Sequence, residues 1–201
     1  MLEVQASLKR GLFTLKAEIK DSGFICLSGL NGSGKSTLLN VIAGILKPDE
    51  GFVKVDSKDV TKLPMERRGV ILVSPDSLIP NLEVSRHLLW GASAKKIQVD
   101  NEAVSRIKEN LGISYQGRVD RLSLGMRERV SLATALLSKP KAILVDEAFS
   151  NIDHREDFIC TFASLCRTES IDLMHTTQRA DDAVLADHHY QLTAGVSSKV
   201  I

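Results

Sequence analysis

Residues 24–37 of the chain read FICLSGLNGSGKST: a short apolar run, then a glycine-rich segment that ends in a lysine and two hydroxyl residues. The apolar run is typical of a β-strand that is buried on both faces. Beyond it, apolar residues recur with a helical period from Ser36 until Pro48, which is expected to stop the helix. A glycine-rich loop therefore joins a buried strand to the N-terminus of a helix.

This loop fits the pattern G-x-x-x-x-G-K-[ST], which in such a setting predicts a site for the phosphates of a nucleoside triphosphate. Glycines let backbone N–H groups curl around an anion, the helix N-terminus adds a positive dipole, and Lys35 supplies a full charge for the β- and γ-phosphates. The alternative is a chance glycine-rich turn. The residues expected to bind the nucleotide are Gly29, Asn31, Gly32, Ser33, Gly34, Lys35, Ser36 and Thr37.

An acidic motif follows much later, in residues 141–153, which read KAILVDEAFSNID. Its apolar run predicts a buried strand that carries Asp146 at its C-terminal end beside the phosphate loop. There Asp146 can hold Mg²⁺ through water, together with the Ser36 hydroxyl. Glu147 is placed to polarise an attacking water. An ordinary strand that ends in an acidic turn is the alternative for this stretch taken alone.

The composition predicts one domain with a substantial core, since 43% of the 201 residues are hydrophobic. A net charge of +1 without a run of one sign is not the footprint of a nucleic-acid-binding protein, so no nucleic-acid partner is expected. No apolar run has the length of a membrane span, and the first residues lack a signal-peptide core. Three cysteines without metal-ligand spacing are expected to be buried and reduced: Cys26, Cys160 and Cys166.

Strands alternate with helices along most of the chain. The expected strands are residues 12–20, 24–29, 52–55, 69–73, 141–147 and 171–175, and helices are expected from residue 36, after residue 126 and in 153–167. This order predicts an α/β P-loop NTPase fold with a mostly parallel sheet flanked by helices and an antiparallel β edge. Asp100 and Gly112 are expected to cap one further helix. Residues 80–122 are expected to form an inserted α-helical subdomain, with the core of the domain in 1–79 and 123–201.

The stretch 122–140, LSLGMRERVSLATALLSKP, resembles the signature motif of the ATP-binding cassette (ABC) ATPases, usually written LSGGQ, with the helix behind it. GLNGSGKST resembles the Walker A motif of that family, AILVDE its Walker B motif with the catalytic glutamate, and SNID its D-loop with Asp153. The resemblance covers nearly the whole chain and implies a single ABC-type ATPase domain over residues 1–201. It also implies that Ser123 and Gly125 contact the γ-phosphate held by another subunit, where a helix N-terminus favours an anion. Ser123 could instead only cap its helix, and both roles can hold at once.

Two motifs depart from the family pattern. Leu124 and Met126 stand where the usual signature has Gly and Gln, whereas Ser123 and Gly125 are kept. In ILVSPDSLIPNLEV, Ser74 stands at the Q-loop position, where a glutamine of the family contacts Mg²⁺ and the attacking water. Because a serine side chain is shorter, it needs a bridging water to reach as far.

Two further positions carry alternatives. The switch histidine of the family follows the next strand; His175 ends the run IDLMH and is the favoured candidate, whereas the spacing back from LAD places Thr177 there. Phe13 is the nearest candidate for the aromatic residue that stacks on adenine, but its alternating strand indicates a core residue. The other histidines are expected to be solvated: His154, His188 and His189.

The resemblance implies an ATPase in which water attacks the γ-phosphate of ATP in line, with Mg²⁺ as cofactor. Glu147 would orient or deprotonate the water, while Lys35 and Mg²⁺ neutralise charge on the phosphate oxygens. His175 would complete the site within the subunit. Ser36 and Asp146 would be the metal-binding residues.

The resemblance further implies two subunits, expected to be alike, that close on two ATP molecules and drive a separate transmembrane permease from the cytoplasmic face of the cell membrane. Trp90 is a candidate for the rim of the permease contact, although most apolar residues near it are expected to be subdomain core. The alternatives are a soluble ABC ATPase without a permease, a non-hydrolytic half of a heterodimer, and another P-loop class such as a small kinase. Ser74 and the two candidates for the switch position favour the second alternative. The kinase would leave the signature unexplained.

Overall fold

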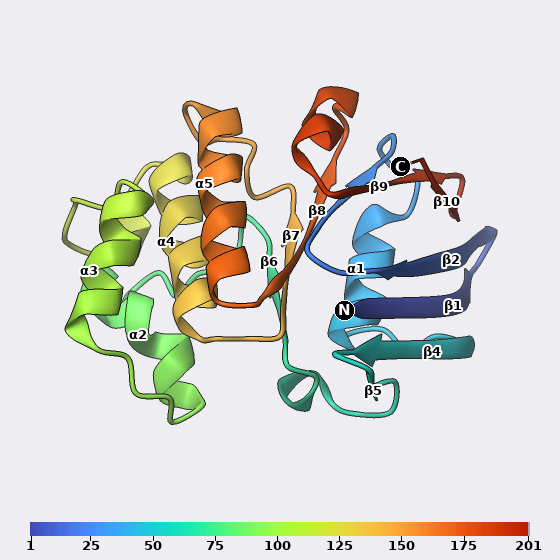
Figure 1. Ribbon diagram of the computed structural model, residues 1–201, viewed down its shortest axis with the longest axis horizontal. Helices are drawn as coiled ribbons and strands as arrows, with labels where there is room; N and C mark the ends of the chain where they lie inside the picture. The colour runs from blue at the N-terminus through green and yellow to red at the C-terminus, as the bar shows by residue number, and fades with distance from the viewer. Residues whose placement is uncertain (201) are drawn as a thin grey trace.

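A computed structural model describes residues 1–200 and shows a ten-stranded sheet with helices on its two faces (Figure 1). The strand order is β5-β4-β1-β2-β10-β9-β3-β8-β7-β6. The strands are β1 Leu2–Arg10, β2 Phe13–Asp21, β3 Phe24–Ser28, β4 Glu50–Val55, β5 Lys58–Asp59, β6 Val70–Val73, β7 Ala142–Asp146, β8 Asp172–Thr177, β9 His188–Thr193 and β10 Val196–Lys199. The helices are α1 Lys35–Ala43, α2 Val84–Ala94, α3 Asn101–Asn110, α4 Leu124–Leu137 and α5 Arg155–Thr168, with short 3₁₀ turns at Met65–Arg67 (η1), Val119–Arg121 (η2) and Ala180–Leu185 (η3).

The sheet has a parallel and an antiparallel part, as the order of elements predicted. β9, β3, β8, β7 and β6 run parallel to one another, whereas β2, β1, β4 and β5 pair antiparallel with one another. β10 joins the two parts, because it pairs with β9 on one side and with β2 on the other. The strands β1, β5, β9 and β10 were not assigned from the sequence.

Two hydrophobic clusters lie on opposite faces of the sheet. Strand β3 contributes side chains to both clusters, because successive side chains of a strand point to opposite faces. Ile25 packs in the cluster around α1, and Phe24 packs in the cluster around α2–α5. In Figure 1 the helices α2–α5 are grouped together, away from α1. The phosphate loop between β3 and α1 therefore starts from a strand that is anchored on both faces.

The helices α2 and α3 lie between β6 and α4 in the chain, where the helical subdomain was expected. Helix α3 starts as predicted, with the Asp100 carboxylate accepting a hydrogen bond of 2.6 Å from the backbone N–H of Ala103, and Gly112 follows its end with a φ of 65°. Helix α2 packs on α4, where His87 Nδ1 lies 2.9 Å from Thr134 Oγ1. The boundaries of the subdomain at residues 80 and 122 remain a prediction.

The C-terminal end of α1 is held by a buried guanidinium group. Arg68 donates hydrogen bonds to the carbonyl oxygens of Val41, Ile42, Leu63 and Thr61 at 2.7–3.1 Å. A Cβ on Gly44 would lie 2.3 Å from the Arg68 Nε atom, so only glycine fits beside it. Arg68 thus fixes the helix that follows the phosphate loop at its far end.

The cysteine expectation holds for two of the three residues. Cys26 and Cys166 are buried, and burial raises the pKa of each thiol to about 12. Cys160 is exposed on α5, so its expected burial was wrong; it lies on the solvent side of an amphipathic helix. Within residues 1–200, no helix combines the length and the apolar character that crossing a bilayer requires.

Candidate functional site

The loop from Gly29 to Gly34 has a backbone that only glycine tolerates at two points. Gly34 has a φ of 106°, and a Cβ there would lie 2.5 Å from the Phe13 Cζ atom. A Cβ on Gly29 would lie 2.5 Å from the carbonyl oxygen of Leu192. The loop is therefore pressed against the strands β2 and β9 that flank it.

The polar groups of this loop fit a phosphate. No side chain caps the N-terminus of α1, so its first N–H groups have no side-chain partner. The Ser33 hydroxyl is buried without a hydrogen-bond partner among the described residues, and Ser36 is exposed. The Lys35 ammonium donates to the carbonyl oxygens of Gly29 and Leu30 at 2.8 and 3.1 Å, which holds the cation across the loop. Free donors around a fixed cation form an anion cradle.

Asp146 and Glu147 lie at the carboxyl end of β7, and β8 separates this strand from β3 and the phosphate loop. Thr176 on β8 connects both acidic residues. Its hydroxyl donates to the Asp146 carboxylate at 2.8 Å and accepts from the backbone N–H of Glu147 at 3.1 Å. Glu147 itself has a left-handed backbone with a φ of 58°. Sequence reasoning missed Thr176, although a hydroxyl residue at the end of a parallel strand is a usable signal.

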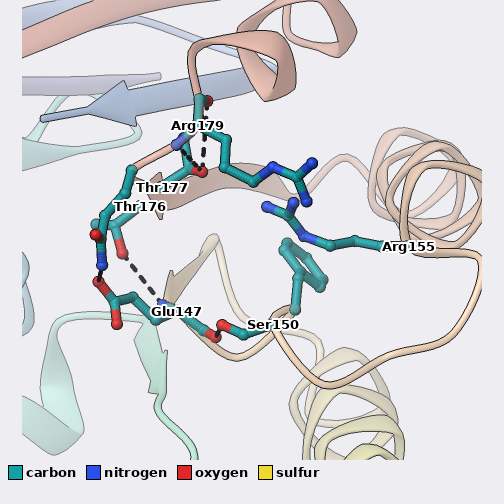
Figure 2. Close-up of a pocket in the computed structure, with 8 residues that line it drawn as sticks. Glu147, Ser150, Arg155, Thr176, Thr177 and Arg179 are labelled. Atoms are coloured by element: carbon teal, nitrogen blue, oxygen red, sulfur yellow. Dashed lines mark hydrogen bonds between the residues drawn. The ribbon is translucent and has the colours of Figure 1, made fainter.

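A cavity of about 250 Å³ opens beside Glu147 at the ends of β7 and β8 (Figure 2). Its lining residues are Glu147, Phe149, Ser150, Arg155, Thr176, Thr177, Gln178 and Arg179. Gln178 donates from Nε2 to the Glu147 carboxylate at 3.2 Å. The Thr177 hydroxyl donates to Asp182, which is buried and also pairs with Arg155.

His175, the favoured candidate for the switch histidine, does not line this cavity. The imidazole packs between Phe24 and Phe149, with ring centroids 5.2 and 5.7 Å away, and is fully buried. Neither ring nitrogen has a hydrogen-bond partner among the described residues. Burial lowers the pKa of His175 to about 4. His175 lies within β8, where its side chain packs in the core, while Thr177, the alternative position, is two residues further along the same face, at the end of the strand, and lines the cavity.

The stretch 122–126 forms the start of α4. The Ser123 hydroxyl accepts a hydrogen bond of 3.3 Å from the backbone N–H of Met126, so Ser123 caps the helix, and it is also exposed. A Cβ on Gly125 would lie 2.3 Å from the carbonyl oxygen of Asn151, in the loop after β7. The helix start therefore packs directly on the segment that follows Glu147.

The protein-family profile described as ABC transporter matches residues 12–150, more than half of the chain. The molybdate/tungstate import ATP-binding protein WtpC of Archaeoglobus fulgidus is 36% identical over 194 residues, which cover 92% of this chain and 80% of that protein. The chain belongs to the ABC transporter family. Within this family it is an ATP-binding ATPase subunit, as its motifs implied.

Other ABC relatives are longer than this chain. The Fe(3+) ions import ATP-binding protein FbpC of Vibrio cholerae is 34% identical over 194 residues, covering 93% of this chain and 52% of that protein. The probable sulfate/thiosulfate import ATP-binding protein CysA of Chlorella vulgaris is 37% identical over 152 residues, covering 72% of this chain and 63% of that protein. The chain thus spans between half and two thirds of these two relatives.

Solved structures of ABC cassettes share the fold. The ADP conformation of MJ1267, an ATP-binding cassette of an ABC transporter, superposes with a TM-score of 0.80 at 26% identity over 98% of this chain and 89% of that chain. A dimeric post-hydrolysis state of the cassette MJ0796, bound to ADP and Pi, gives a TM-score of 0.82 at 21% identity over 100% of this chain and 99% of that chain.

The remaining positions singled out from the ABC motifs lie around the same edge of the sheet. Ser74 follows β6, and its hydroxyl lies 3.0 Å from Ser77 Oγ, while its backbone N–H donates to the same atom at 2.9 Å. This hydroxyl is thus engaged in a local turn. Asp153 is exposed, and its carbonyl oxygen accepts from Arg129 on α4 at 3.3 Å.

Phe13 was expected to be core, and it is only half-buried. Its ring lies over Gly34 of the phosphate loop and next to Gly195. His154 is exposed as expected, whereas His188 and His189 on β9 are half-buried, contrary to the expectation of solvated side chains. His189 Nε2 is hydrogen-bonded to Ser28 Oγ at 2.7 Å.

Proposed function

We propose that this ABC subunit hydrolyses ATP at the loop Gly29–Thr37, with Glu147 as the group that orients or deprotonates the attacking water. The observation that carries the proposal is the hydroxyl of Thr176, which ties Asp146 and Glu147 together one strand away from the phosphate loop. A carboxylate fixed beside a phosphate cradle is what in-line hydrolysis requires. Lys35 neutralises charge on the β- and γ-phosphates.

Magnesium is the metal that this donor set fits, because Ser36 offers an exposed hydroxyl and Asp146 a carboxylate oxygen. Ser36 and Asp146 would hold Mg²⁺, which when bound supplies positive charge to the phosphate oxygens. Thr176 then has a second task, since its hydrogen bond fixes the orientation of the Asp146 carboxylate.

Two copies of the chain are proposed to close on two ATP molecules, with Ser123 and Gly125 of one copy facing the nucleotide on the other. The exposure of Ser123 at the N-terminus of the 14-residue helix α4 supports this role, because such a terminus attracts a phosphate. The related cassette MJ0796, which shares the fold, is described as dimeric. Asp153 lies in the same loop as Asn151, on which the start of α4 packs.

The subunit is proposed to power import through a separate permease at the cytoplasmic face of the membrane. The names of its relatives support import, since each is an import ATP-binding protein. Trp90 on α2 supports a docking rim in the helical segment, because 53% of this large apolar side chain is exposed.

A second candidate is a subunit that binds ATP but hydrolyses it slowly in a mixed dimer. Two observations favour it: the hydroxyl of Ser74 is engaged with Ser77, and Thr177 rather than a histidine lines the cavity beside Glu147. Steady-state ATPase measurements with purified protein separate the two candidates.

The dimer is tested with Glu147→Gln, which keeps the nucleotide site and removes the base. We expect a monomer without ATP and a dimer with ATP and Mg²⁺ in light scattering, and no ATP-dependent dimer for the control Glu147→Gln with Ser123→Arg. A protein that binds ATP and stays monomeric would contradict the pairing of like subunits. Failure to bind ATP at all would contradict the assignment of the loop.

A further inference from the structure

The cavity beside Glu147 brings two guanidinium groups together. In Figure 2 the side chains of Arg155 and Arg179 point toward one another, whereas the Glu147 side chain lies at the other end of the group of residues. Like charges that face each other repel unless a negative group lies between them. With about 250 Å³, the cavity is smaller than the roughly 300–1,000 Å³ of sites for drug-sized ligands, so it suits a small anion.

Arg155 is only partly satisfied by the protein. It pairs with Asp182, a buried carboxylate that also accepts the hydrogen bond of the Thr177 hydroxyl. Asp182 therefore neutralises the charge of Arg155 and fixes its position. The Nε–H group of Arg155 is buried and has no hydrogen-bond partner among residues 1–200, which leaves one donor free.

Arg179 carries the unmatched charge of the cavity. Its guanidinium has no hydrogen bond or ion pair in the described part of the chain, although its backbone is fixed by an N–H bond of 3.0 Å to Thr177 Oγ1. The proton of the Thr177 hydroxyl is committed to Asp182, and the Gln178 amide is bonded to Glu147. Among the side chains that line the cavity, Arg179 is thus the cation available to an incoming ligand.

We propose that Arg179 and Arg155 form a binding site for a phosphate group beside Glu147. The ligand is either the γ-phosphate of bound ATP or the inorganic phosphate that hydrolysis releases, since both present the same oxyanion to a guanidinium fork. The inference rests on the proposed function for the origin of this phosphate. Arg179 supplies the free charge, and Arg155, held by Asp182, supplies the second guanidinium.

The experiment uses Arg179→Gln, which removes the charge from an exposed side chain and spares the fold, and Arg179→Lys, which keeps the charge. The control is Arg67→Gln, the same change at an exposed arginine in η1. Arg67 precedes β6, whereas Ser74 follows the other end of that strand. Inorganic phosphate is titrated into each nucleotide-free protein and followed by ³¹P NMR. Affinities for ATP and for ADP are then measured separately in a Glu147→Gln background.

If released phosphate is the ligand, Arg179→Gln weakens phosphate binding about tenfold, Arg179→Lys less, and Arg67→Gln not at all. If the γ-phosphate is the ligand, Arg179→Gln lowers the affinity for ATP about tenfold and leaves that for ADP unchanged. Equal binding of phosphate, ATP and ADP by Arg179→Gln and the wild type overturns the proposal. A wild-type protein that binds no ATP refutes the proposed function instead, and the phosphate titration still decides the anion site.

Discussion

Glu128 on α4 accepts two hydrogen bonds from Asn151, one from its backbone N–H at 3.2 Å and one from its side-chain amide at 2.7 Å. Only 3% of Glu128 is exposed, and burial raises the pKa of its carboxyl group. The helix that begins at Ser123 is therefore locked to the loop that follows Glu147. One buried carboxylate thus connects the start of α4 to the loop after Glu147 in the same chain.

Replacing Glu128 by alanine removes the acceptor of both hydrogen bonds from Asn151. We expect Glu128→Ala to lower the free energy of unfolding by about 2 kcal/mol, measured by urea denaturation. Glu109→Ala, at an exposed glutamate of α3, is the control and should change stability by less than about 0.5 kcal/mol. Equal losses in the two variants would mean that the link to Asn151 contributes nothing.

His175 makes the stability of the fold depend on pH. Its pKa falls from 6.5 to about 4 because the imidazole is buried between aromatic rings. The unfolded chain therefore binds a proton that the native state does not, so stability is fully present above pH 6.5 and is lost as pH falls toward 4, by up to about 3 kcal/mol. Urea denaturation across this range should show the loss in the wild type and a smaller loss in His175→Leu.

The same variant tests the catalytic role that His175 was expected to have. We expect His175→Leu to keep the ATPase rate within about threefold, since the ring does not line the cavity, whereas loss of an acid–base group lowers a rate about 100-fold or more. Thr177→Val, measured beside it, removes a group that does line the cavity. A hundredfold loss in His175→Leu with an intact fold would restore the original assignment.

Arg68 is the arginine whose substitution is expected to lower the free energy of unfolding most. Arg68→Met removes the donors of four carbonyl groups at and near the end of α1, and we expect a loss of about 3 kcal/mol or more in unfolding free energy. Arg68→Lys should recover only part of this, because an ammonium group cannot span the same acceptors. The adjacent Arg67, which is exposed, provides the control Arg67→Met.

Comparing alanine substitutions at Gly34 and Gly32 distinguishes backbone strain from steric conflict in the phosphate loop. Both have positive φ angles, of 106° and 76°, but a Cβ on Gly34 meets the Phe13 ring whereas a Cβ on Gly32 meets nothing within 4 Å. We expect Gly34→Ala to destabilise the protein by about 1–2 kcal/mol more than Gly32→Ala. Combining Gly34→Ala with Phe13→Ala should remove that difference, and additive losses in the double variant would show that the ring is not the obstacle.

The parts of the site that the sequence predicted are those with a local pattern. The loop Gly29–Thr37 and the pair Asp146 and Glu147 each carry their mechanism in consecutive residues, so one strand and one turn are enough to place them. The caps of α3 are local in the same way, since Asp100 contacts a residue three positions away.

The parts that were missed depend on how far along a strand a residue lies and on what packs over it. His175 and Thr177 lie two residues apart on the same face of β8, but Phe24 and Phe149 pack on His175 in the core, whereas Thr177 ends the strand at the cavity. The spacing back from Leu185 was the signal for Thr177. Arg155 begins α5, whereas Arg179 and Asp182 lie together at the start of η3, so nothing in the sequence around Arg155 joins it to the other two. The strands β9 and β10 are short and carry polar residues, which masked their alternation.

The position of β10 has a consequence for how the protein is made. Because β9 and β10 are the elements that join β2 to β3 in the sheet, strand pairing between the antiparallel part and the parallel part runs, in the described residues, through 188–199. During synthesis β1 and β2 emerge early, together with β4 beside them, yet β9 and β10, which join β2 to the rest of the sheet, emerge much later. The phosphate loop, which is pressed between Phe13 and Leu192, therefore acquires its final shape only after these last strands have left the ribosome. A nascent chain that stalls before β9 and β10 would contain the phosphate loop but would lack the strand that packs against it.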